Sequence, residues 1–162
     1  MYFTIVDCDM KQIHTDYADN YGIAVYKAII AGISLDNAYF VGQDLTRANF
    51  SACLTNIINA DFSGAQISID DLGPKLALSN LVGAIVVDGD NKTVITEQPK
   101  FLYLNGYYGV IFGSLLKIAG NANGALYCGT VSDWDNLGDH MWLNGYRSEF
   151  RRNRDAIVKL VK

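Results

Sequence analysis

The apolar and polar positions near the N-terminus follow two periodicities in succession. Aromatic and β-branched residues cluster over residues 2–6, just before a polar stretch, and this pattern predicts a strand. Over residues 17–28 the apolar side chains recur every three or four positions, which predicts a helix. Thr15 or Asp16 can cap the start of that helix, because their side-chain oxygens can accept a hydrogen bond from a free backbone N–H.

Two glycines bear on this helix. Gly32 follows the last apolar position and predicts the C-terminal cap. Gly22 lies inside the run and costs about 1 kcal/mol relative to alanine. We therefore expect packing against the rest of the protein, rather than intrinsic propensity, to hold the helix.

After the helix the apolar spacing becomes five, which fits neither the 3.6-residue period of a helix nor the two-residue period of a strand. A two-residue slip at Cys53-Leu54 interrupts the grid once. Repeats of this kind bury their bulky residues only against neighbouring repeats, so we expect different structure at each end. The bulky positions are Leu35, Phe40, Leu45, Phe50, Ile57, Phe62 and Ile67.

Two units within this grid, Ala48-Asn49-Phe50-Ser51-Ala52 and Ala60-Asp61-Phe62-Ser63-Gly64, resemble the pentapeptide-repeat family, whose units read roughly A-(D/N)-L-x-x. The resemblance implies a right-handed, four-sided β-helix with four repeats in each coil. Residues 35–67 would then supply about two coils. Residues 79–86 look like one further pair of repeats.

We therefore expect an α+β protein in three parts. Residues 1–32 would form the N-terminal strand and capping helix, and residues 33–87 a short right-handed pentapeptide-repeat β-helix of about two to three coils. Residues 88–162 would form a small C-terminal αβ module that ends in a basic helix.

Turn residues and apolar runs predict the elements of this last part. A hairpin turns at Asp88-Gly89-Asp90-Asn91, and the apolar run 101–120 fits a buried hairpin around Asn105-Gly106 better than a membrane span. The remaining elements are a strand at 125–129, a helix at 133–143 capped by Ser132, and the basic helix within 147–162.

Composition narrows the class of protein. Half of the 162 residues are apolar, which is enough for a folded core, and the net charge of −4 argues against binding to duplex DNA. The three cysteines form no CxxC pair. Near the N-terminus the chain has the acidic residue Asp7, where a secretory signal would carry Lys or Arg. We therefore expect a cytoplasmic protein.

The sequence offers few candidates for chemistry. His14 and His140 have no second ligand at metal spacing, and no cofactor or nucleotide-hydrolysis motif occurs, so we expect no metal, no cofactor and no enzyme. Cys128 precedes a predicted helix and could be a nucleophile, but a structural thiol is the alternative because no general base accompanies it.

The remaining candidate site lies near the C-terminus, where residues 147–162 carry a net charge of +4. Aromatic side chains interleaved with arginines can bind an acidic protein surface or a nucleotide. The alternative is the solvated face of an amphipathic helix. The residues are Trp142, Tyr146, Arg147, Arg151, Arg152 and Arg154.

The order of the parts, together with residues 28–50 and 127–134, resembles small bacteriophage accessory proteins. We expect a non-enzymatic phage accessory protein, in the host cytoplasm, that binds a host protein such as one used in defence. A protein that sequesters a small anionic nucleotide is one alternative, and a DNA-mimicking inhibitor is another. Mimicry is disfavoured because two or three coils rise only about 10 to 15 Å. We also expect a homo-oligomer and no membrane partner.

Overall fold

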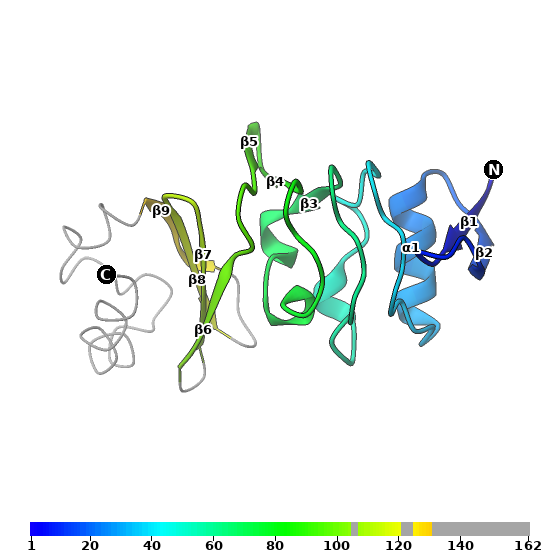
Figure 1. The fold of residues 1–162 in the computed structure, drawn as a ribbon, viewed down its shortest axis with the longest axis horizontal. Coiled ribbons are helices and arrows are strands. Elements are labelled where there is room, and N and C mark those ends of the chain that lie inside the picture. The colour runs from blue at the N-terminus through cyan, green and yellow to red at the C-terminus, as the bar shows by residue number, and fades with distance from the viewer. Residues whose placement is uncertain (105–106, 121–124, 131–162) are drawn as a thin grey trace. The chain divides into compact units, whose positions relative to one another are not determined.

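The computed structural model of the chain describes residues 1–104, 107–120 and 125–130. The chain divides into two compact units, Met1–Gln98 and Pro99–Lys162 (Figure 1). We call them unit 1 and unit 2.

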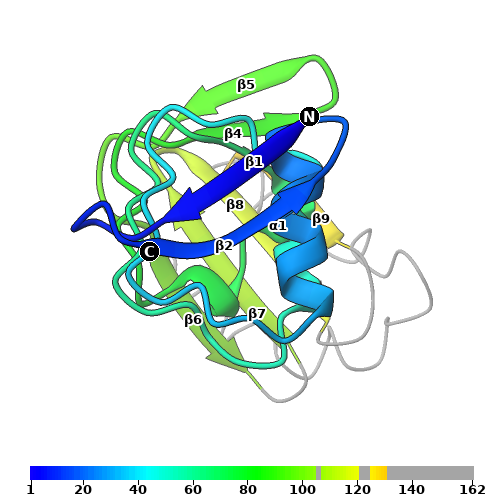
Figure 2. The same ribbon diagram turned by 90° about the vertical axis from the view of Figure 1, so that its right-hand side faces the viewer.

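Unit 1 begins with an antiparallel two-stranded sheet. The strand predicted over residues 2–6 is confirmed as β1 (Tyr2–Val6) and pairs with β2 (Gln12–Tyr17), so the two strands lie side by side (Figure 2). The predicted helix caps at Thr15 and Asp16 are wrong, because both residues belong to β2, where Thr15 pairs with Thr4. Cross-strand pairing outweighs the local preference of these residues for a cap.

The helix α1 spans Tyr21–Ile30 and starts at Asn20, whose side chain accepts a hydrogen bond from the Ile23 N–H at 2.9 Å. The predicted C-terminal glycine is confirmed. Gly32 has a φ of +75° and donates its N–H to the Ile29 carbonyl, while Ile33 donates to that of Ala28. This pair of bonds is the Schellman termination, which needs a residue that tolerates the left-handed conformation.

The five-residue grid is confirmed as a burial pattern. All seven bulky positions are at most 3% exposed. Three of them form a cluster at the centre of the unit: the rings of Phe40, Phe50 and Phe62 pack with centroids 5.2 to 5.9 Å apart. The spacing of five therefore places one apolar side chain per repeat in the core of unit 1.

The expected fold class, an α+β protein with a right-handed pentapeptide-repeat β-helix of about two to three coils, is wrong. The described residues form three separate sheets, β1-β2, β3-β4-β5 and β6-β7-β8-β9, together with one α-helix. Residues 31–65, all of them described, contain no strand. A turn follows every few residues there, so the extended stretches are too short for a strand and pair only as isolated bridges.

Among the described residues, three of the four isolated bridges are parallel and the fourth, Asp7 with Ala38, is antiparallel; all four join segments far apart in sequence. Tyr39 pairs with Asp61, Asp61 with Asn80, and Asp44 with Gln66. Short 3-10 helices at Phe50–Ala52, Ile69–Asp71 and Pro74–Leu76 lie between the bridged segments. The isolated bridges lead into a sheet, because the strand β3 begins at Gln66.

β3 (Gln66–Ser68) pairs in parallel with β4 (Ile85–Asp88), and β4 pairs antiparallel with β5 (Asn91–Val94). The hairpin predicted around residues 88–91 is therefore confirmed, and Gly89 adopts a φ of +58° in its turn.

The chain after β5 closes the open edge of this arrangement. The Gly83 N–H donates to the Ile95 carbonyl at 2.7 Å. The side-chain amide of Gln98 then donates to the Ser79 carbonyl at 2.8 Å and accepts the Leu81 N–H at 2.9 Å. Gln98 thus makes the two hydrogen bonds that another strand would make, and satisfies backbone groups that are costly to leave unpaired.

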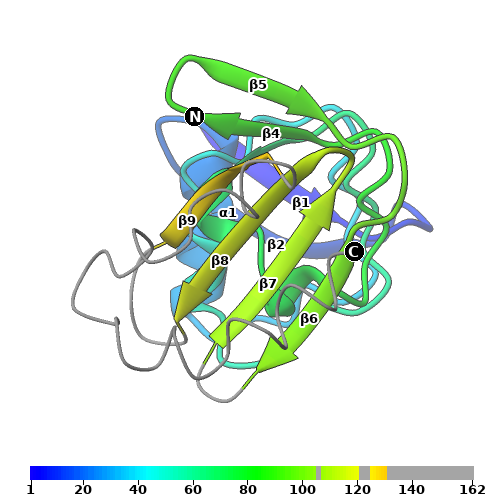
Figure 3. The same cartoon turned by 90° about the vertical axis from the view of Figure 1, so that its left-hand side faces the viewer.

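In unit 2 the described residues form a four-stranded antiparallel sheet in the order β6-β7-β8-β9 (Figure 3). Its strands are β6 (Lys100–Leu104), β7 (Tyr107–Phe112), β8 (Leu115–Gly120) and β9 (Ala125–Thr130). β6 and β7 flank residues 105 and 106, as the predicted hairpin requires, and β9 confirms the predicted strand.

The described part of unit 2 thus contains the strands of the expected αβ module. The two helices predicted over 133–143 and 147–162 lie outside the described residues. Within the described part of the chain, no helix has the length and apolar character needed to cross a membrane.

Candidate functional site

The site predicted from the sequence, Trp142, Tyr146, Arg147, Arg151, Arg152 and Arg154, lies outside the described residues, as does His140. It stays a prediction. Cys128 is in β9, the helix predicted to follow it lies outside the described residues, and the side chain of Cys128 is not among those described.

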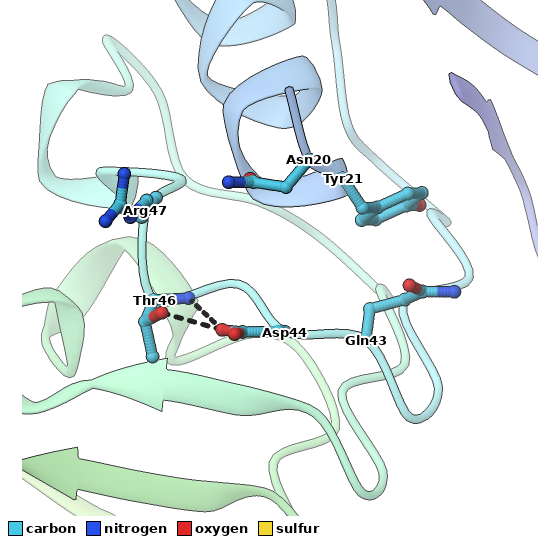
Figure 4. Close-up of a pocket in the computed structure, with 6 residues that line it drawn as sticks. All are labelled: Asn20, Tyr21, Gln43, Asp44, Thr46 and Arg47. Atoms are coloured by element: carbon cyan, nitrogen blue, oxygen red, sulfur yellow. Dashed lines mark hydrogen bonds between the residues drawn. The ribbon is translucent and has the colours of Figure 1, made fainter. Parts of the chain in front are cut away.

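In unit 1 a small polar pocket lies where the start of α1 meets the repeats (Figure 4). Its volume is about 170 Å³. The lining residues come from two segments more than twenty positions apart: Asn20 and Tyr21 at the start of α1, and Gln43, Asp44, Thr46 and Arg47 in the repeats. We call this the α1 pocket.

Gly22 allows these two segments to approach each other. A Cβ on this buried glycine would lie 3.0 Å from the Asp44 carbonyl oxygen and 3.5 Å from the Arg47 backbone nitrogen. A contact of 3.0 Å is tighter than nine in ten real Cβ contacts, so a side chain here would make the neighbouring backbone shift. The glycine that weakens the helix by propensity therefore permits this close packing.

Asp44 is the anionic group of the pocket. Its Oδ1 accepts hydrogen bonds from the Thr46 N–H at 3.0 Å and from the Thr46 hydroxyl at 2.6 Å. The side-chain and backbone hydrogen bonds from Thr46 hold the pKa of Asp44 below its ordinary value, and the charges of Lys92 and Arg47 act in the same direction, against partial burial. Asp44 is therefore ionised at neutral pH.

Tyr21 forms an apolar wall. Its ring packs edge-to-face against Phe3 and Phe40, with centroids 6.1 and 6.4 Å away. Burial raises the pKa of Tyr21 to about 12, so the hydroxyl stays neutral and can only donate or accept a hydrogen bond. The pocket thus combines a carboxylate, a guanidinium, two amides and a neutral phenol, which suits binding rather than proton transfer.

A second feature of unit 1 is a cluster of exposed apolar side chains, Leu54, Ile58 and Leu78, which we call the apolar patch. Their side chains are 92%, 41% and 55% exposed. Two hydrogen bonds join the segments: the Asn59 N–H donates to the Leu78 carbonyl at 3.0 Å, and the side-chain ammonium of Lys75 donates to the Leu54 carbonyl at 3.3 Å.

One feature of the sequence, the break in the five-residue spacing, indicates part of this patch. The slip at Cys53-Leu54 moves Leu54 off the buried grid and onto the surface. The α1 pocket had no comparable signal, because its residues meet only through the packing of α1.

Among the described residues, the other titratable groups do not form an arrangement of nucleophile, base or metal ligands. Burial raises the pKa of the Cys53 thiol to about 11, and burial together with Asp61, Asp7 and Asp9 raises that of Cys8, so both thiols are protonated at neutral pH. His14 lies 3.5 Å from Asp16 within β2. No group of three or more His, Cys, Asp or Glu side chains among the described residues is placed to hold a metal ion.

Comparison with protein families gives one match: the family model for pentapeptide repeats, eight copies, covers residues 33–68. This segment is a pentapeptide-repeat region. It holds the buried grid from Leu35 to Ile67 and four of the six residues of the α1 pocket. No curated protein and no solved structure matches the chain. The repeat match describes a structural element and names no reaction or partner.

Proposed function

We propose that the protein is a non-enzymatic binding protein that docks on another protein through the apolar patch of unit 1. The observation that carries this proposal is the exposure of three aliphatic side chains, including Leu54 at 92%, on segments that hydrogen bonds hold together. Single exposed apolar residues are normal on a protein surface, but a contiguous cluster is typical of an interaction site.

The charge of unit 1 indicates the chemistry of the partner. Residues 1–98 carry five Lys or Arg against twelve Asp or Glu, a net charge of −7. A partner with an apolar centre and basic residues around it would complement this surface and associate faster. The proposed partner is a host protein bound by a phage accessory protein in the host cytoplasm, such as a protein used in defence. This part of the proposal is supported by the order of the parts in the sequence.

The test is affinity capture from host lysate with two matched variants. Leu78→Ser removes a patch residue that is 55% exposed, and Val94→Ser removes an equally exposed apolar residue, 56%, from β5. We expect Leu78→Ser to lower recovery of a basic partner about tenfold, as loss of about 1.4 kcal/mol would. Val94→Ser should leave recovery unchanged. No partner, or equal losses in both variants, would contradict the proposal.

The alternative function, sequestration of a small nucleotide by the arginine-rich segment, is favoured by the +4 charge of residues 147–162. A ligand at a hundredfold excess over its Kd stabilises a protein by about 2.7 kcal/mol, which a thermal-shift screen of nucleotides would detect. A shift that disappears in Arg151→Ala/Arg152→Ala would support this alternative, and a flat screen would exclude it.

A further inference from the structure

We propose that the α1 pocket binds a small zwitterion, the size of a free amino acid, with its carboxylate at Arg47 and its ammonium group at Asp44. This inference is independent of the apolar patch, because it concerns a different surface and a different class of ligand.

The pocket holds two opposite charges, Asp44 and Arg47, that can each still bind a ligand group. Among the described residues no ion pair joins Asp44 and Arg47. Both hydrogen bonds from Thr46 go to the Oδ1 atom of Asp44, so the described protein groups leave Oδ2 as an acceptor. A ligand ammonium group at Oδ2 would make a charge-assisted hydrogen bond.

Near Arg47 the Asn20 side chain supplies a second hydrogen-bond donor. The Oδ1 atom of Asn20 is already used by the Ile23 N–H, which leaves the Asn20 amide nitrogen as a donor. In Figure 4 this nitrogen points toward the side of the pocket where Arg47 lies. A carboxylate there would accept from both a guanidinium and an amide.

The size of the pocket favours small ligands. Pockets for drug-sized molecules are about 300 to 1,000 Å³, and the α1 pocket is about 170 Å³. A free amino acid fits within this volume, whereas a nucleotide would extend beyond it.

The charges also select among small ligands. A simple anion would be attracted by Arg47 and repelled by Asp44, whereas a simple cation would be attracted by Asp44 and repelled by Arg47. A neutral polyol would give neither group a counter-charge. A zwitterion satisfies both at once, so its two halves should bind better joined than separate.

The walls of the pocket are set before any ligand arrives. Gly22 packs against the backbone of residues 44 and 47, and the Tyr21 ring is held between two phenylalanines. The Gln43 carbonyl accepts the Gln66 N–H at 2.9 Å. A preformed site loses little conformational entropy on binding.

The experiment is a titration of the ¹⁵N-labelled full-length protein, followed by amide chemical shifts at pH 7 and constant ionic strength. The probes are glycine, acetate, methylammonium, an equimolar mixture of the last two, and glycerol. We expect glycine to cause saturable shifts at Gly22, Thr46 and Arg47, with an affinity about tenfold above that of acetate or methylammonium.

Two variants test the assignment of charges. Asp44→Asn and Arg47→Gln should each weaken glycine binding about tenfold. The matched control is Asp61→Asn, because the Asp61 carboxylate accepts from the Ser63 N–H at 3.0 Å and from the Ser63 hydroxyl at 2.6 Å, the same arrangement outside the pocket. It should leave glycine binding unchanged, and the spectra themselves report whether each variant is folded.

Several results would overturn the inference. These are the absence of saturable shifts with glycine, equal binding of acetate or glycerol, and an equal loss of affinity in Asp61→Asn and Asp44→Asn. None of them bears on capture of a protein by the apolar patch, so the two proposals can fail separately.

Discussion

Asp and Asn side chains close turns in unit 1. Within the pentapeptide-repeat segment, Asp44 and Asp61 each accept two hydrogen bonds from the residue two positions further on, and beyond it Asn80 accepts one from the Val82 N–H at 3.2 Å. Asp and Asn side chains commonly bond the backbone in this way. At the scale of single residues, these Asp and Asn side chains therefore stabilise turns, and Asp44 also lines the α1 pocket.

These bonds predict a pH dependence of stability. The Thr46 hydrogen bonds lower the pKa of Asp44. Burial raises that of Asp61, but the hydrogen bonds from Ser63 and Asn80 outweigh this and leave it lowered. A folded-state pKa below the unfolded value of about 3.9 means that the stabilisation is present above that pH and is lost as the pH falls through the folded pKa.

We therefore expect the free energy of unfolding to decrease below about pH 4. The double variant Asp44→Asn/Asp61→Asn should be less stable at pH 7 and should lose less on acidification. Urea unfolding of both proteins at pH 7 and at low pH measures this. An equal acid loss in the two proteins would show that other carboxyl groups are responsible.

At the scale of elements, the position of α1 depends on one close approach. The helix packs with its first turn over residues 44–47, and Gly22 is the point of contact. Replacing it with alanine has two opposed effects. Alanine improves helix propensity by about 1 kcal/mol, whereas overpacking a buried contact costs about 1 to 3 kcal/mol.

The steric term should prevail, because the atom that a Cβ would meet at 3.0 Å is a backbone oxygen and cannot rotate away. We expect Gly22→Ala to lower the Tm, measured by circular dichroism. A higher Tm would mean that α1 can shift on the repeats without loss, and would also weaken the case for a preformed α1 pocket.

At the scale of the whole molecule, unit 1 makes hydrogen bonds at both ends of its bridged segments. At one end the Tyr39 N–H donates to the Val6 carbonyl. At the other, Ile95 and Gln98 bond to Gly83, Ser79 and Leu81. Exposed strand edges invite pairing with other chains, and covering them is a common way to prevent it.

This closure predicts that a fragment of residues 1–98 folds on its own, whereas a fragment of residues 1–90 does not. The shorter fragment lacks β5, Ile95 and Gln98, and so removes the partners of β4 along its β5 edge, of the Gly83 N–H and Ala84 carbonyl, and of the Ser79 carbonyl and Leu81 N–H. Cooperative thermal unfolding of the first fragment and its absence in the second would bear this out. Equal unfolding curves would show that the closing segment is dispensable.

Sequence reasoning reached several elements and missed others. It found β1, the end of α1 at Gly32, the hairpin of β4 and β5, and the burial of every fifth residue from Leu35 to Ile67. It missed β2, placed the start of α1 too early, and expected a continuous β-helix where isolated bridges and separate sheets occur. Of the candidate sites, the slip at Leu54 hinted at the apolar patch, nothing pointed to the α1 pocket, and the arginine-rich segment stays a prediction.

The physical reason for this division is the range of the interactions. Caps, tight turns and burial periodicity depend on a few neighbouring residues, so they can be read from the chain alone. β2 forms because it pairs with β1. The α1 pocket forms because Gly22 lets a helix approach a turn more than twenty residues away. The Gln98 side chain makes its two hydrogen bonds only because the fold brings Ser79 and Leu81 next to it. Such contacts form between segments distant in sequence, so only the folded molecule defines them.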